Sequence, residues 1–173
     1  MIQRIEREAD NAVAGYPARI IAKVNSLVDP KVIRALYRAS QAGVAIDLIV
    51  RGMCCLRPGI DGVSGNIRVR SVVGRFLEHT RVYYFANGGE PEVFGSSADW
   101  MERNFFRRVE TAFPVEDQEQ RDRMIRELDL YLRDNTQAWV LNIDGSYTRL
   151  QPEPGEEAVS AQHLLLAELA EQV

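Results

Sequence analysis

Residues 18–50 read ARIIAKVNSLVDPKVIRALYRASQAGVAIDLIV and contain two mostly apolar runs, 18–24 and 44–50, separated by an amphipathic segment. Both runs are rich in branched aliphatic residues and have the length of a buried strand. Asp29 followed by proline is typical of a helix start, and Gly43 is typical of a helix end. Two such strands joined by a helix predict a parallel β-α-β unit with helices covering the sheet.

The rest of the chain adds shorter elements around this unit. The apolar spacing and the turn residues predict helices at 2–13, 71–77, 99–106 and 117–133, and strands at 67–70, 81–86, 92–95, 108–114, 138–143 and 147–150. A Pro- and Gly-containing linker at 151–155 then leads to an acidic helix at 156–171. We therefore expect an α/β fold with a mixed sheet, one domain over residues 1–150, and an appended linker and acidic helix over 151–173.

Composition limits the class of protein. The 173 residues fit one compact domain, and no run of about 18 uncharged apolar residues or secretory leader is present, so we expect a cytoplasmic protein without a membrane span. The adjacent Cys54 and Cys55 suit neither a loop-closing disulfide nor a zinc site, and packing is their expected role. The net charge is −4, yet residues 51–81 hold six arginines against two acidic residues. This local excess of positive charge predicts an anion-binding region.

The stretch 48–89, LIVRGMCCLRPGIDGVSGNIRVRSVVGRFLEHTRVYYFANGG, combines these arginines with many glycines and one of the two histidines of the chain. Guanidinium groups form paired hydrogen bonds with phosphate oxygens, and glycines let backbone N–H groups come close to a ligand. The combination favours a ligand rich in phosphate.

Arg51 is the strongest candidate because it directly follows the strand predicted at 44–50. Ligands of open α/β sheets bind outside the carboxyl ends of the strands. Lys23 and Asn25 end the preceding strand, so they belong to the same edge, with loop bracing as the alternative role. For Arg51 the alternative is a structural salt bridge to Asp47 or Glu78.

Other polar residues have weaker claims. His79 beside several arginines is suited to donate to a phosphate, although composition alone favours the alternative of a structural histidine bonded to a backbone carbonyl. Ser96 lies in the motif GSSAD, which suits either anion contact or helix capping. Arg57 and Arg75 share the anion-binding claim more weakly, and simple solvation is their alternative. No grouping of residues predicts a metal site.

The stretch 48–89, together with AKVNSLVDP before it and FGSSADWMERNFFRRVE and DNTQAWVLNIDGSYTRL after it, resembles the C-terminal catalytic domain of the polyphosphate kinases that use a phosphohistidine. The match covers about residues 9–150. The resemblance implies a phospholipase D-like mixed sheet covered by helices on both faces. It also implies that this chain corresponds to the last quarter of a four-domain protein.

For function, the resemblance implies reversible transfer of the terminal phosphoryl group of ATP to inorganic polyphosphate, with Mg²⁺ bound mainly through a missing domain and ATP. The histidine that becomes phosphorylated belongs to the preceding domain, and no residue here matches it. Arg51 matches the family arginine that contacts nucleotide phosphate. His79 matches the second histidine, which binds phosphate and assists transfer, so the resemblance makes it the catalytic candidate.

The implied partners are ATP or ADP, polyphosphate, the upstream domains of the same polypeptide and a second copy in the full-length form, with no nucleic acid. The phospholipase D motif His-x-Lys reads His79-Thr80-Arg81 here, and Ala98 replaces the asparagine of Gly-Ser-x-Asn. These departures disfavour one alternative, a phosphodiesterase that acts as a homodimer. A non-catalytic polyanion-binding module is the other alternative.

Overall fold

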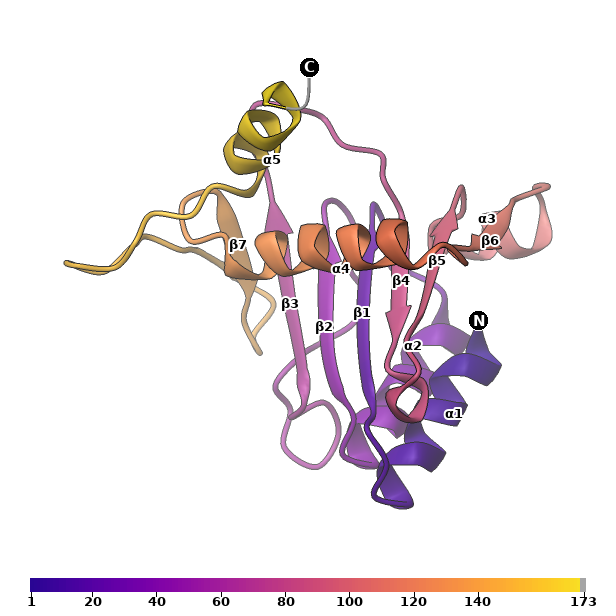
Figure 1. Ribbon diagram of the computed structural model, residues 1–173. Coiled ribbons are helices and arrows are strands. Elements are labelled where there is room, and N and C mark those ends of the chain that lie inside the picture. Colours follow the sequence, from indigo (N-terminus) through magenta and orange to yellow (C-terminus); the bar gives the residue numbers. More distant parts are fainter. Residues whose placement is uncertain (172–173) are drawn as a thin grey trace.

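The computed structural model describes residues 1–171 and forms one mixed sheet with helices on both faces (Figure 1). The strand order is β6-β5-β4-β1-β2-β3-β7-β8, in which β1, β2 and β3 run parallel and the other pairings are antiparallel. The expected α/β class and mixed sheet are thereby confirmed. The strands are β1 (Arg19–Val24), β2 (Ala45–Val50), β3 (Ile67–Val72), β4 (Val82–Phe85), β5 (Glu92–Ser96), β6 (Ala112–Pro114), β7 (Ala138–Leu141) and β8 (Tyr147–Arg149).

Helices α1 and α2 pack on one face of the sheet, and α4 crosses the other face with α5 beside it (Figure 1). Asp29 caps α2 as expected, because its carboxylate accepts from the N–H groups of Lys31 and Val32 at 2.9 Å each. The helices are α1 (Ile2–Val13), α2 (Pro30–Gln41), the 3-10 turn η1 (Asn87–Gly89), α3 (Glu102–Phe106), α4 (Gln118–Arg133) and α5 (Ala161–Ala170).

The core has two layers, one on each side of the sheet. Along β1, Ile20 and Ala22 face α1 and α2, whereas Ile21 faces α4. Successive side chains of a strand point to opposite faces, so a continuous apolar run is what a strand covered on both sides requires. Among the described residues, no helix is both long and apolar enough to cross a lipid bilayer.

The helix expected at 71–77 is wrong. Ser71 and Val72 continue β3, and residues 73–81 cross to β4 without regular secondary structure. Two adjacent valines favour the extended conformation, and Gly74 follows them. Tertiary contacts then decide the path, because a Cβ at Gly74 would come within 2.5 Å of Oε1 of Gln162 on α5.

Three other expected elements are shorter than predicted. The helix expected at 99–106 begins only at Glu102, because Trp100 is fully buried in a bridge to Leu27. The strand expected at 108–114 is limited to β6. The helix expected at 156–171 begins at Ala161, because the loop after α4 holds the segment before it, and Asn135 Oδ1 accepts there from the N–H of Val159 at 2.8 Å.

Helix α5 packs against the hydrophobic core on the α4 side of the sheet. Ala161 is fully buried, its N–H donates to Asp134 at 2.8 Å, and Leu165 packs against the α4 side of the core. The division into residues 1–150 and 151–173 stays a prediction, and its last two residues lie outside the described part of the chain. Within that part, α5 and the sheet share one core.

Candidate functional site

The candidate site lies where β1, β2 and β3 end and β4 begins. Arg51 directly follows β2, and its N–H donates to the carbonyl of Val24 at 3.2 Å. The carbonyl of Arg51 accepts from the hydroxyl of Ser71 on β3 at 3.1 Å. The parallel strands thus hold the Arg51 backbone from both sides, as predicted for a residue at the carboxyl edge of the sheet.

The Arg51 side chain reaches the segment that carries His79. Its NH1 donates to the carbonyl oxygen of Glu78 at 2.6 Å. Asn25, in the amide orientation that satisfies both its polar atoms, donates to the same carbonyl at 3.0 Å. A guanidinium has five N–H donors, so this one bond leaves Arg51 with donors for a ligand.

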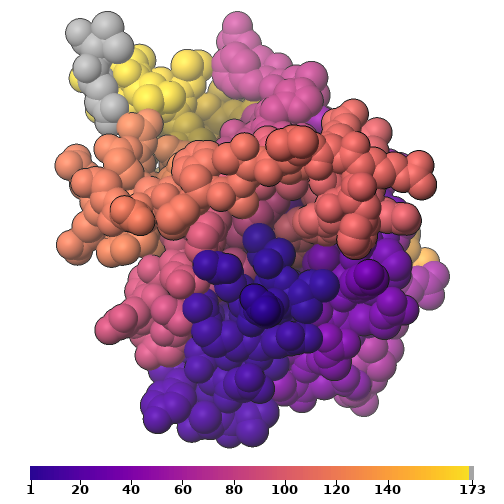
Figure 2. Space-filling view, turned by 90° about the vertical axis from the view of Figure 1, so that its right-hand side faces the viewer, coloured from indigo at the N-terminus to yellow at the C-terminus, as the bar shows by residue number. Residues whose placement is uncertain are grey.

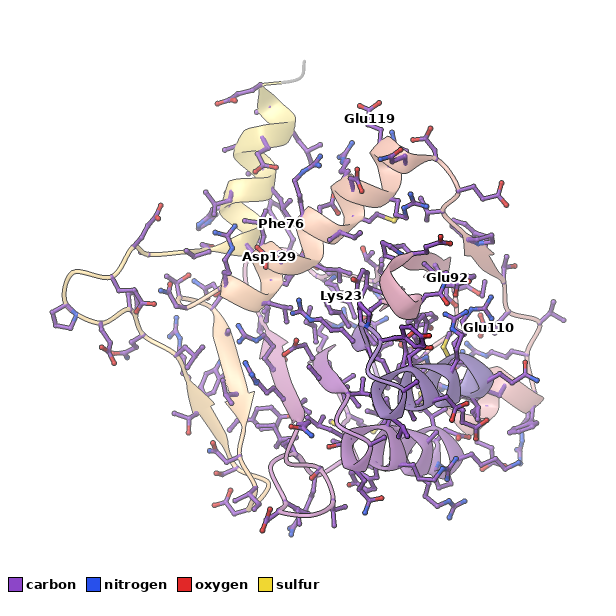
Figure 3. The ribbon with its side chains drawn as sticks, turned by 60° about the horizontal axis from the view of Figure 1, so that its bottom comes forward. Lys23, Phe76, Glu92, Glu110, Glu119 and Asp129 are labelled. Carbon is purple, nitrogen blue, oxygen red and sulfur yellow. The ribbon has the colours of Figure 1, made fainter. Side chains whose placement is uncertain are left out.

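The Glu78 carboxylate is held by three parts of the chain. It accepts from the Lys23 ammonium of β1, from the Tyr131 hydroxyl of α4 at 2.7 Å and from Nε2 of Gln162 on α5 at 2.6 Å. Figure 3 shows Lys23 under α4 and Phe76 near the start of α5. Both carboxylate oxygens therefore have donors, and the side chain links the two helices to the sheet.

The charges in this cluster stabilise one another. Burial alone raises the pKa of Glu78, but the hydrogen bond and charge of Lys23, with the hydrogen bonds from Tyr131 and Gln162, outweigh it and lower the pKa. The pKa of Tyr131 is raised by burial and then by its bond to the Glu78 carboxylate. Lys23, only 7% exposed, is thus an internal counterion and lies 4.5 Å from the centre of the Tyr131 ring.

His79 is exposed, and its backbone is fixed on both sides. Glu78 precedes it, and its own carbonyl accepts from NH1 of Arg81 at 2.9 Å. Its imidazole makes no hydrogen bond to any described residue of the chain. The structure therefore holds the backbone of His79 and leaves its ring accessible at the same edge as Arg51.

Arg81, which replaces the lysine of the phospholipase D motif, is paired with Asp99. Its Nε and NH2 each donate to that carboxylate at 3.1 Å. Asp99 also accepts from the N–H groups of Asn25 at 2.8 Å and Ser26 at 3.2 Å. Burial raises the pKa of Asp99, but the Arg81 bonds and charge, with the two backbone bonds, lower it overall. Arg81 thus shapes the loop after β1.

Ser96 serves mainly as a local brace in this structure. Its hydroxyl accepts from the N–H of Ala98 at 3.0 Å and donates to the carbonyl of Thr111 at 3.2 Å. The neighbouring Ser97 hydroxyl donates to Glu110 at 2.5 Å. These contacts fit the capping alternative for the motif, and the anion-binding role of Ser96 stays a prediction.

The two lesser arginines lie apart from the Arg51 cluster. The Arg57 backbone donates to the Tyr37 hydroxyl at 2.9 Å, and its charge acts on Asp144 in the β7–β8 turn, whose pKa is lowered first by hydrogen bonds from Ser146. Arg75 is exposed and lies over the ring of the adjacent Phe76, 5.6 Å from its centre. Only Arg51, His79, Lys23 and Asn25 of the predicted residues gather at one place.

The residues at this edge do not fit a resident Mg²⁺ ion. In residues 1–171 no three His, Cys, Asp or Glu side chains come together as a metal site. Both oxygens of Glu78 and both oxygens of Asp99 are engaged by donors of the chain itself. Magnesium prefers carboxylates that are free to coordinate it, and these two carboxylates are not.

Sequence reasoning missed the residues that organise the site. The sequence suggests Glu78 only as a salt-bridge partner of Arg51, and it places Tyr131 and Gln162 on predicted helices with no sign of a role at the edge. One signal was present, because Glu78 is the single acidic residue between Asp61 and Glu90 and directly precedes His79.

Comparisons with known proteins identify relatives of this chain. The family described as "Polyphosphate kinase C-terminal domain 2" matches residues 1–162. A polyphosphate kinase of Pseudomonas aeruginosa is 63% identical over 170 residues, which are 98% of this chain and 25% of the relative. One of Neisseria meningitidis serogroup B is 60% identical over 94% of this chain and 24% of the relative. The chain thus spans about a quarter of the length of these relatives.

Solved structures show the same relationship. The crystal structure of polyphosphate kinase from Porphyromonas gingivalis matches with a TM-score of 0.93 and 45% identity, over 98% of this chain and 26% of that one. The phospholipase D family member Nuc from Salmonella typhimurium matches with a TM-score of 0.56 and 13% identity, over 78% of this chain and 88% of that one. NucT from Helicobacter pylori matches with a TM-score of 0.55 and 14% identity, over 76% and 89%. The last two share the fold, which confirms the expected phospholipase D-like architecture.

Proposed function

The chain belongs to the polyphosphate kinase family, as a homologue of its C-terminal part, and we propose that it supplies one wall of a phosphoryl-transfer site. In the complete protein the terminal phosphoryl group of ATP passes reversibly to inorganic polyphosphate by way of a histidine in the preceding part. This chain binds phosphate oxygens of the nucleotide or the polymer. Because ATP is the donor, the proposal includes a cytoplasmic location.

The observation that carries the proposal is the hydrogen bond from Arg51 to the carbonyl of Glu78 at 2.6 Å. It joins the end of β2 to the residue that directly precedes His79. A guanidinium with free donors and an exposed imidazole therefore share one edge of the sheet, although 27 residues separate Arg51 from Glu78 in the sequence.

This pair suits the chemistry of phosphoryl transfer. The transition state spreads negative charge over the oxygens of the transferred group, so catalysis depends on alignment and on fixed donors. Arg51 donates to oxygens of the transferred phosphate. His79 in its protonated form donates to the departing ADP oxygen or to the growing chain end. Neither residue is the nucleophile.

The surface around the site supports a role for further domains. Val73 and Leu77 are 56% and 75% exposed, and both lie in the segment that carries His79. Large apolar side chains in water favour association with another surface. We propose the preceding domains of the same polypeptide as that surface, and a second copy in the full-length enzyme. Mg²⁺ then arrives with the nucleotide and the preceding domains.

Two experiments test the proposal. The chain alone, incubated with ATP labelled at its terminal phosphate, should form neither polymer nor a stable phosphohistidine. Either product would contradict the proposal that the phosphorylated histidine lies in the preceding part of the protein. In a full-length polyphosphate kinase that carries this chain as its C-terminal part, Arg51→Ala should lower kcat about a hundredfold. Unchanged turnover in that variant would also contradict the proposal.

The non-catalytic alternative gives a different pattern. A simple polyanion-binding module loses affinity for inorganic tripolyphosphate in Arg51→Ala and in rising salt, but it is indifferent to His79→Ala. The transferase proposal expects His79→Ala to lower kcat of the full-length enzyme as well. For the phosphodiesterase alternative, hydrolysis of bis-p-nitrophenyl phosphate by the chain would be the decisive result.

A further inference from the structure

We propose that Gln162 is a positioning residue of the phosphate site, through which α5 holds the His79 segment in its binding orientation. The inference rests on the proposed function and deepens it. It assigns a role to a helix that contributes no side chain to Arg51 or His79 themselves.

The segment 73–81 has little structure of its own to hold it in place. It contains no helix or strand, and Val73, Phe76 and Leu77 are 56%, 44% and 75% exposed. Loops with few buried apolar contacts open at low free energy. The position of His79 therefore depends on the side chains that bind this segment from outside.

Gln162 provides three of these contacts. Its Oε1 accepts from the N–H of Phe76 at 2.9 Å, and its Nε2 donates to the Phe76 carbonyl at 2.9 Å and to the Glu78 carboxylate at 2.6 Å. The side chain is only 6% exposed and satisfies the backbone of Phe76 as a neighbouring strand would. One glutamine thus fixes the segment at two points just before His79.

The first turn of α5 is itself anchored, so Gln162 is a fixed point. The N–H of Ala161 donates to the fully buried Asp134 at 2.8 Å, and the Thr136 hydroxyl donates to the carbonyl of Val159 at 3.1 Å. Figure 2 shows α5, in yellow, and the segment 73–81, in magenta, side by side at the top of the molecule. The constraint on His79 therefore runs from the end of α4 through α5 to Glu78.

Gly74 allows the close approach of Gln162. A Cβ at position 74 would lie 2.5 Å from Oε1 and 3.0 Å from Cδ of that side chain. Gly74→Ala therefore displaces the carboxamide without removing any hydrogen-bonding group or straining the backbone. It disturbs the same contact from the opposite side and gives an independent test.

The test uses the chain itself with inorganic tripolyphosphate as the probe. The sequence has two histidines, so the imidazole signals of His79 in a proton–carbon NMR spectrum can be assigned with one variant. In the unaltered chain these signals should shift with tripolyphosphate. Gln162→Ala and Gly74→Ala should each weaken binding about tenfold, because the ligand must then order the segment. Gln151→Ala, at an exposed glutamine of the linker, is the matched control and should bind normally.

Gln162→Glu gives a readout that a merely structural role would not move. The new carboxyl faces the Glu78 carboxylate. Repulsion between the two charges disfavours the ionised form of the new carboxyl and raises the pKa of that group above the ordinary value of about 4.3. The affinity of this variant relative to the unaltered chain should therefore fall as the pH rises through that raised pKa. Protonation of the ligand affects both proteins and cancels in the ratio.

The outcomes separate the two proposals. If tripolyphosphate leaves His79 unmoved in the unaltered chain, the proposed function is wrong. If it binds there and the folded Gln162 and Gly74 variants keep normal affinity with a flat pH ratio, only the positioning role is wrong. A lower unfolding midpoint with normal affinity has the same meaning, because it shows that α5 stabilises the fold without orienting His79. Should Gln162→Ala fail to fold, Gly74→Ala and Gln162→Glu decide.

Discussion

Replacing Asp99 by asparagine tests how the loop after β1 is held. The carboxylate receives four hydrogen bonds, two from Arg81 at 3.1 Å and one each from the backbones of Asn25 and Ser26 at 2.8 and 3.2 Å. Asparagine keeps one oxygen for the backbone donors, but its Nδ2 then faces NH2 of Arg81. The variant therefore loses the charged pair and sets two donors against each other.

The expected loss of stability follows from these contacts. Side-chain exposure is 8% for Asp99 and 19% for Arg81, so water replaces the lost partner poorly. The oxygen that remains still accepts from Nε of Arg81, so the variant loses the NH2 bond and the charge of the pair. We expect a loss of about 3 kcal/mol, the lower end of the range for breaking a buried pair. For a chain of this length, the melting temperature should fall by about 9 °C.

Urea unfolding followed by circular dichroism measures this loss. Asp129→Asn is the matched control, because its i,i+4 pair with Arg133 is 58% exposed on both sides and contributes little. The pKa of Asp99 is lowered in the folded state, so its stabilisation is fully present above the unfolded value of about 3.9 and is lost as the pH falls through the folded value. A loss below about 1 kcal/mol at pH 7, or one equal to that of the control, would refute the reasoning.

Three further substitutions probe other parts of the fold. Tyr83→Phe should lower the free energy of unfolding in urea by about 1–2 kcal/mol. The Tyr83 hydroxyl donates to the carbonyl of Ala98 at 2.5 Å, and in the variant this carbonyl stays buried without a donor. Equal unfolding midpoints would contradict this. Leu36→Ala should cost about 2–5 kcal/mol by leaving a cavity under α2, since Leu36 is fully buried, and a smaller loss would show that the site collapses. Arg38→Ala removes an ion pair with Glu6 whose side chains are 56% and 49% exposed, so the unfolding free energy should change by less than about 0.5 kcal/mol; a larger change would show that exposed pairs matter here.

Much of the fold was predictable because its signals are local. The runs that became β1 and β2 lie within six residues each, and Asp29 and Gly43 mark the helix between them. The path of residues 73–81 was not predictable in this way. Its local sequence has helical spacing, but Gly74 and Phe76 are held by Gln162, which is 86 residues away from Phe76 along the chain. Tertiary contact overrode local preference there.

The same difference between local signals and long-range contacts applies to the site. The position of Arg51 at the carboxyl edge was predictable from one strand and its end. Ligands of parallel sheets bind at that edge, so its role as a phosphate contact is a prediction from the same position. Lys23 was predicted at that edge too, but its ammonium faces Glu78 rather than an open site. A sequence shows that a cation lies at an edge and leaves open whether the chain already supplies its anion.

Glu78 explains why the arginine-rich stretch has one acidic residue beside its histidine. Its three side-chain partners stand 55, 53 and 84 residues away, on β1, α4 and α5, so no local pattern points to them. The carboxylate satisfies the buried Lys23, which would otherwise attract the incoming phosphate away from the exposed ring. With that charge neutralised internally, the free donors of Arg51 and the imidazole of His79 remain the proposed contacts for a ligand. Removing the carboxylate would therefore do more than loosen a loop, because it would create a competing cation inside the site.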